Sequence, residues 1–96
     1  MIKTTKIDFN GNKLDAISIK TENSIVLLVK AKKGMLGCGY FSIDAANKLG
    51  DALAVVTGVN DFDQMLAAQV KLVSDKAREL GVSEGMSGKQ ALEKMI

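Results

Sequence analysis

One cysteine carries most of the reactive chemistry open to this chain. Cys38 is the only cysteine, and the 96 residues contain no histidine. Cys–His and Ser–His nucleophile pairs within the chain are therefore excluded, as is the usual imidazole base. A thiol enzyme would need lysine or a carboxylate as its proton acceptor, and no recognisable motif places one beside Cys38. Two interpretations stay open: Cys38 is a catalytic or redox thiol, or it is a small buried side chain in a strand.

Glycines on both sides of Cys38 suggest a ligand site. Gly37-Cys38-Gly39-Tyr40-Phe41-Ser42 matches the phosphate-binding pattern G-x-G-x-x-G, except that Ser42 replaces the last glycine. Three expected hairpin strands precede this stretch, whereas dinucleotide folds begin with it, so a dinucleotide site is disfavoured. A looser site for a small ligand, with anions among the candidates, fits the expected helix start at Ser42. The residues that we expect to bind this ligand are Gly37, Gly39, Ser42, Asp44 and Gly58.

A second glycine-rich stretch is better explained by helix capping. Residues 85–89, Gly-Met-Ser-Gly-Lys, resemble a P-loop, but Ser83 stands where its first glycine belongs, and Gln90 replaces the required Ser or Thr. Ser87 and Gln90 instead have the spacing of a capping box, which predicts the start of a last helix. One cysteine without histidine cannot build a zinc site, and we expect neither a metal nor another cofactor.

Charge is unevenly distributed, although the net charge is only +2. Residues 1–33 hold seven lysines against three acidic residues, and Lys30, Lys32 and Lys33 form a local cluster. A nucleic-acid-binding domain usually shows a stronger basic stripe, so nucleic-acid binding through this cluster ranks below the other two functions. Lysines on the solvent face of a sheet are the alternative explanation.

Length and hydropathy predict one domain, residues 1–96, in the cytoplasm. A chain of this size has no room for a second core. Its longest apolar runs, Ile25 to Val29 and Ala52 to Val56, have five residues, whereas a membrane span needs about 20. Lys3 to Phe9 alternates in polarity and does not resemble the apolar block of a signal peptide.

The first half of the chain has the alternation of β-strands. Asn10-Gly11 is a strong signal for a two-residue hairpin turn. Such a turn would place Ile17 and Ile19 on the face opposite Ile7 and Phe9, so we favour a three-residue loop or a bulge. The expected antiparallel meander comprises Lys3 to Phe9, Leu14 to Lys20, Ile25 to Val29 and Met35 to Phe41.

The second half changes to helical spacing with glycine stops. Asp61 to Gln64 resembles a capping box, so Asp61 and Asp63 are interpreted as cap residues and not as an acid/base pair. The third helix has an uncertain start, because Gln69 to Val73 could also pair as a short strand. The expected elements are helices Ile43 to Leu49, from Phe62, about Leu72 to Leu80 and Ser87 to Met95, with a strand from Ala52 to Thr57.

Together these elements predict a two-layer α+β domain. Its mostly antiparallel sheet has a four-strand meander and a fifth strand, and about four short helices cover one face. Ile25 to Val29 is apolar on both sides, so the other face also needs cover. We therefore expect self-association into a homo-oligomer, for which the five methionines would suit the contact surface.

A set of residues spread along the chain carries a family resemblance: Met35, Cys38, Gly39, Asp44, residues 47–51, Ala54, Gly58, Val59, Leu66, Ala67, residues 80–82, Gly85, Met86, Gly88, Ala91 and Leu92. This pattern resembles that of the YunC-like family of small bacterial and archaeal proteins, a domain of unknown function. The resemblance covers nearly the whole chain and is strongest from Gly34 onward. It implies a compact α+β domain and no established activity.

Overall fold

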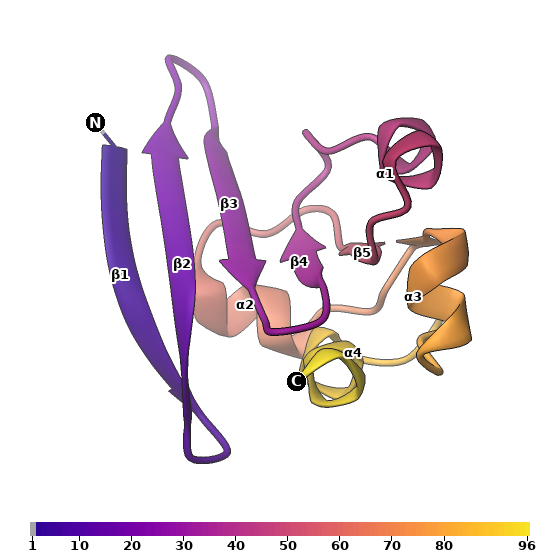
Figure 1. The fold of residues 1–96 in the computed structure, drawn as a ribbon. Coiled ribbons are helices and arrows are strands. Elements are labelled where there is room, and N and C mark those ends of the chain that lie inside the picture. The colour runs from indigo at the N-terminus through magenta and orange to yellow at the C-terminus, as the bar shows by residue number, and fades with distance from the viewer. Residues whose placement is uncertain (1) are drawn as a thin grey trace.

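The structure, a computed structural model, describes residues 2–96, and these form a six-stranded sheet with four helices (Figure 1). The strands lie side by side in chain order, and all neighbours except β4 and β5 are antiparallel. The α+β class is confirmed. The strands are β1 (Ile2–Phe9), β2 (Asn12–Lys20), β3 (Ile25–Lys30), β4 (Met35–Gly37), β5 (Leu53–Val55) and β6 (Leu72–Val73). The helices are α1 (Ile43–Leu49), α2 (Phe62–Ala67), α3 (Asp75–Glu79) and α4 (Gly88–Met95).

The β1–β2 hairpin corrects the predicted loop. Phe9 pairs with Asn12, so Asn10 and Gly11 alone form the turn, with φ angles of 51° and 82°. Both angles are positive, as a type I′ turn requires. The prediction of a three-residue loop was wrong because it assumed that all four isoleucines and phenylalanines of the hairpin share one face. The partner of Ile7 is Leu14, and Leu14 is buried on the core face in place of the β2 isoleucines.

The connection from β4 through α1 to β5 produces the single parallel pair among residues 2–96. β4 is shorter than the predicted strand Met35 to Phe41, because the N–H of Phe41 donates to the carbonyl of Cys38 and turns the chain toward α1. α1 begins and ends as predicted, with Ser42 as N-cap and Gly50 in the left-handed conformation after its last residue. The fifth strand is also confirmed, although it is shorter than Ala52 to Thr57.

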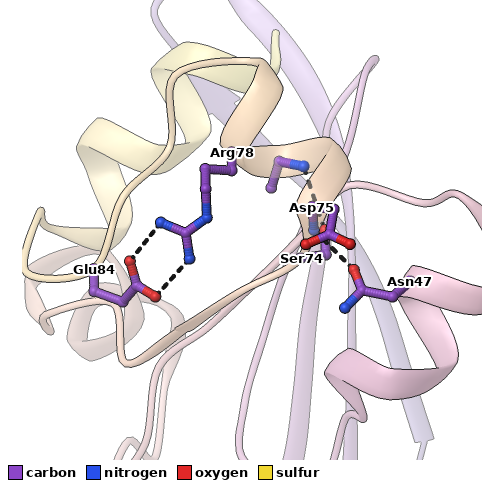
Figure 2. A network of polar contacts seen from close by, with 6 residues as sticks. Asn47, Ser74, Asp75, Arg78 and Glu84 are labelled. Carbon is purple, nitrogen blue, oxygen red and sulfur yellow. Dashed lines mark hydrogen bonds and ion pairs between the residues drawn. The ribbon is translucent and has the colours of Figure 1, made fainter.

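The third helix starts later than predicted, after its N-cap residue Ser74. Leu72 was expected in that helix, with a short strand within Gln69 to Val73 as the alternative. The alternative is confirmed, because Leu72–Val73 is the edge strand β6 and α3 begins after Ser74. The buried Ser74 hydroxyl accepts from the N–H of Leu53 at 2.8 Å and donates to the carbonyl of Asp51 at 2.9 Å. It also caps α3, so one side chain fixes both the start of β5 and the start of the helix. Figure 2 shows Asn47 of α1 and Ser74 together at this junction.

Short helices make this fold depend on caps and packing, because helices of five to eight residues are unstable alone. Asp61 caps α2, and Ser87 with Gln90 forms the predicted capping box of α4. Gly88 lies so close to α2 that a Cβ atom there would be 2.0 Å from the carbonyl oxygen of Met65. None of the helices in residues 2–96 has the length and hydrophobicity to span a bilayer.

The helices divide between the two faces of the sheet. Leu36 and Ala54 point to the main core, which also contains Met65 of α2 and Leu92 of α4. The alternate side chains of β4 and β5 point to the other face, where Leu53 and Val55 pack with α1. The prediction of all helices on one face therefore fails for α1. In Figure 1, α2 lies behind β2 and β3, whereas α1 and α3 lie beside the long strands.

Candidate functional site

A cleft of about 380 Å³ lies where the parallel strands end. The chain leaves β4 and β5 at the same end of the sheet, because the carboxyl ends of two parallel neighbouring strands lie side by side. Antiparallel β3 begins at this end and supplies a third wall. Crevices outside the carboxyl ends of parallel strands are the usual ligand sites of open α/β sheets. The residues that line this β4–β5 cleft are Ser24, Ile25, Cys38, Gly39, Tyr40, Gly58, Val59 and Asn60.

Cys38 lies at the base of the cleft with its side chain buried, and the residue is only 4% exposed. Its N–H donates to the carbonyl of Leu27 at 3.1 Å, and the N–H of Leu27 donates to its Sγ at 3.3 Å. In a regular antiparallel ladder the Cys38 carbonyl would accept this second bond. That carbonyl instead accepts from Phe41, so the thiol replaces it as the acceptor for Leu27. The geometry gives Cys38 a structural task at the end of β4.

Three of the predicted binding residues lie outside the cleft lining. Gly37 is buried under Phe41, whose Cδ2 would be 2.7 Å from a Cβ atom on that glycine. Packing therefore explains why this position lacks a side chain. The Ser42 hydroxyl accepts from the N–H of Ala45 at 3.2 Å as the α1 cap. Asp44 is exposed in the first turn of α1, where its charge complements the helix dipole.

The cleft offers main-chain donors without any charged side chain in its lining. Among residues 2–96, the N–H groups of Gly39, Tyr40 and Gly58 donate no hydrogen bond to the protein. Gly58 has a φ of 71°, a conformation that in turns creates concave groups of amides that bind anions. Ser24, Tyr40 and Asn60 add hydroxyl and amide groups. This set can donate several hydrogen bonds to a ligand but cannot form an ion pair with it.

Lysines of the predicted nucleic-acid cluster lie at the other end of β4. Lys30 ends β3, and Lys32 and Lys33 lie in the turn before Met35, whereas the cleft follows Gly37. The cluster and the cleft are therefore separate sites. Across residues 2–96, no group of three or more His, Cys, Asp or Glu side chains is placed to hold a metal ion.

Comparison with known proteins shows what this fold and sequence are similar to. The family described as "Domain of unknown function (DUF1805)" matches residues 37–95, which is more than half of the chain. The chain belongs to the DUF1805 family. It is 30% identical, over its whole length and 99% of the relative, to the uncharacterized protein YunC of Bacillus subtilis (strain 168). The predicted YunC-like resemblance is confirmed.

A solved structure has the same fold as this DUF1805 chain. The crystal structure of TA1206, a protein of unknown function from Thermoplasma acidophilum, superposes with a TM-score of 0.94. The two chains are 29% identical, and the match covers 100% of this chain and 94% of TA1206. These relatives establish the family and the fold, and none of their descriptions states an activity.

The DUF1805 match begins at Gly37 and so includes both loops of the cleft that follow the parallel strands. Sequence reasoning placed Cys38, Gly39 and Gly58 in one site, and the structure brings them together there. It omitted Tyr40 from the binding residues, although this is the only tyrosine of the chain and lies near the end of the expected strand Met35 to Phe41, shortly before the expected helix. Ser24 and Asn60 carry no sequence signal, because only the order of the strands brings them to the cleft.

Proposed function

We propose that the protein is a binding module for a small molecule that carries a carboxylate or phosphate group, held in the β4–β5 cleft. The observation that carries this proposal is the set of main-chain N–H groups on Gly39, Tyr40 and Gly58 without protein acceptors. Because these three residues are exposed, their N–H groups are accessible to a ligand, and oxygen-rich anions are the natural acceptors for clustered amides. The cleft is small and uncharged, which suits a compact anion bound through hydrogen bonds.

Tyr40 supplies the largest accessible side chain of the cleft. It is 60% exposed, so its ring can fold over a bound molecule without displacing a core contact. Its ring offers an apolar surface and its hydroxyl a hydrogen bond. We assign Tyr40 to ligand contact, whereas Cys38 supports the floor of the cleft.

Titration followed by amide NMR tests this function. Acetate and inorganic phosphate are added separately at millimolar concentrations, and acetamide serves as the uncharged match for acetate. The expected result is a saturable shift of the Gly39, Tyr40 and Gly58 amides with one of the two anions, and a much weaker response to acetamide. Shifts confined to surface lysines, or equal effects of acetate and acetamide, would contradict the proposal.

Two variants locate the binding. Tyr40→Ala removes the exposed ring and is expected to weaken anion binding about tenfold, the effect of one lost contact worth about 1.4 kcal/mol. Leu49→Ala is the matched control, because Leu49 is 76% exposed on α1 and does not line the cleft. Equal affinities of both variants and the parent protein would remove Tyr40 from the site.

A further inference from the structure

Half of one sheet face carries apolar side chains that no helix covers. The register places Ile19 between Ile2 and Val26, and Ile17 beside Leu28, all on the face opposite Leu14. Ile2 is 66% exposed, and Ile17, Ile19 and Leu28 lie outside both hydrophobic core clusters of the described residues, whereas Val26 is half-buried and also packs against the main core. We call Ile2, Ile17, Ile19, Val26 and Leu28 the apolar half-face. A contiguous apolar patch of this kind marks an interaction surface.

The charged half of the same face limits the kind of partner. Lys6 pairs with Asp15, and Lys13 lies 3.7 Å from Asp8, so most charges there are balanced within the chain. Lys30, opposite Asp15 in the register, is the remaining charge. A surface that is neutralised in this way provides little attraction for nucleic acid or an anionic membrane, both of which select clustered basic residues. The half-face is therefore suited to another uncharged, apolar surface.

We propose that the apolar half-face is covered by the same half-face of a second copy, in a two-fold symmetric homodimer. Sheets pack face to face through flat rows of apolar side chains, and the copy offers a surface of matching shape and polarity. Superposing the two apolar halves leaves the charged residues Lys6, Asp15 and Lys30 at the border. This arrangement gives the apolar centre and polar rim that protein interfaces have.

The available area fits a weak, reversible dimer. The whole face of the three strands, with its charged half included, covers roughly 14 Å by 25 Å, or about 350 Å², at the usual strand spacing and rise, so the apolar half-face alone is about half of this. A standard interface buries about 800 Å² on each partner. Phe41 and Ile43, half-buried beside Met35 at the edge of α1, can extend the contact beyond β3. We therefore expect a dissociation constant of roughly some hundreds of micromolar.

Sedimentation velocity over a concentration series tests the dimer. The parent protein is expected to pass from its monomer mass of 10.2 kDa toward twice that mass as concentration rises through roughly some hundreds of micromolar. Ile17→Lys places a charge at the centre of the half-face and is expected to weaken association at least about tenfold. Ile2→Lys is the second variant, because Ile2 is already 66% exposed and its replacement leaves the core intact.

Leu72→Lys is the matched control, since Leu72 is a 50% exposed leucine on β6, outside the half-face. Circular dichroism confirms that each variant is folded before it is compared. A parent protein that stays monomeric to about 1 mM, or a control that weakens association as much as Ile17→Lys, would overturn the proposal. Binding of the monomer to anionic vesicles through the half-face would also overturn it and identify a membrane as the occupant. The dimer does not depend on the anion site, which the NMR titration tests separately.

Discussion

At the scale of single residues, Cys38 shows how a reactive atom can be used for structure. Its Sγ accepts the N–H of Leu27 because its own carbonyl is used by Phe41. Sulfur is a weak acceptor, but a buried N–H group without any acceptor lowers the stability of the fold more than one with a weak hydrogen bond does. The two glycines beside Cys38 are explained by different requirements. Gly37 makes room for the ring of Phe41, and Gly39 lines the cleft.

This role predicts a protected thiol. A thiol-specific reagent is expected to modify Cys38 in native protein at least about a hundredfold more slowly than in protein unfolded by urea, because a side chain in a residue only 4% exposed must first be released by opening of the β4 end. The rate is measured spectroscopically at neutral pH. Modification of native protein as fast as of unfolded protein would restore the alternative, an enzyme that uses Cys38.

Replacement of the sulfur is the matching test of stability. Cys38→Ala leaves the Leu27 N–H without its acceptor and is expected to lower the free energy of unfolding by about 1–2 kcal/mol. Ligand shifts in the cleft should survive this change if the residue only supports the floor. Loss of all ligand shifts in a folded Cys38→Ala protein would show that the thiol itself contacts the ligand.

For single residues, the sequence was sufficient to locate the stretch Gly37 to Ser42 but not the role of each residue in it. Residue types and order were enough to place Cys38, Gly39 and Gly58 in one site, because Cys38 and Gly39 belong to the glycine-flanked pattern Gly37 to Ser42 and Gly58 directly follows an expected strand. The contact between Gly37 and Phe41 could not be predicted, since it depends on how sharply the chain turns after β4. Ser24 comes to the cleft only because β3 lies beside β4 in the sheet.

At the scale of elements, local signals predicted helix starts well and strand pairing less well. The caps Ser42, Asp61 and Ser87 lie where their spacing indicated, because a cap is made by a few consecutive residues. The sequence also showed the two-residue Asn10-Gly11 turn. We rejected this turn because we assumed that the apolar residues of both strands lie on one face of the sheet. Strand β6 lies within Gln69 to Val73, the stretch that the sequence left open between strand and helix. Its two residues are too few for alternation to decide, and the strand forms because Ser74 and its neighbours bond to β5.

An ion pair joins α3 to the loop that follows it and predicts that the stability of the fold depends on pH. Arg78 donates to both carboxylate oxygens of Glu84 at 2.9 and 2.7 Å (Figure 2), and these hydrogen bonds are the main reason that the pKa of Glu84 falls from 4.5 to about 2. The folded-state pKa is therefore below the unfolded one. Stabilisation by the pair is fully present above about pH 4.5 and is lost as pH falls toward 2.

Urea unfolding at several pH values measures this effect. Glu84→Gln is expected to lower the urea midpoint slightly at pH 6 and to approach the parent protein as pH falls to about 2, where Glu84 is about half protonated in the folded state and almost fully protonated in the unfolded state. The difference is small because the pair is about half exposed. Glu79→Gln removes a charge of the same sign from α3 and should show no such convergence, since Glu79 joins no ion pair within residues 2–96. A midpoint difference for Glu84→Gln that grows toward acid pH would contradict this role of the pair.

At the scale of the whole molecule, the helices cover the two faces of the sheet unevenly. β4 and β5 have helices on both faces, whereas the β1–β2–β3 part has helices on one face only. The sequence indicated this imbalance, because Ile25 to Val29 is apolar on both sides and 96 residues leave little chain to cover the second face. It could not show which strands stay bare, since that depends on α1 crossing to the face opposite α2 and α4.

Uneven cover predicts a gradient of local stability that hydrogen exchange can measure. Cys38 and Val56 are buried, and their N–H groups bond across the central strands to Leu27 and Gly37. We expect these amides to exchange only through global unfolding, with a strong dependence on denaturant. β1 lies at the sheet edge, so its amides should exchange through a smaller opening that depends weakly on denaturant.

Protein concentration separates the contributions of fold and dimer to this gradient. Below the dissociation concentration, β1 amides should exchange faster than those of Cys38 and Val56; above it, cover of the half-face should slow β1 and β2 selectively. Ile17→Lys should abolish this concentration dependence and leave exchange at Cys38 unchanged. Equal denaturant dependence of β1 and Cys38 at low concentration would show that the hairpin unfolds with the core, and that the bare face does not weaken it.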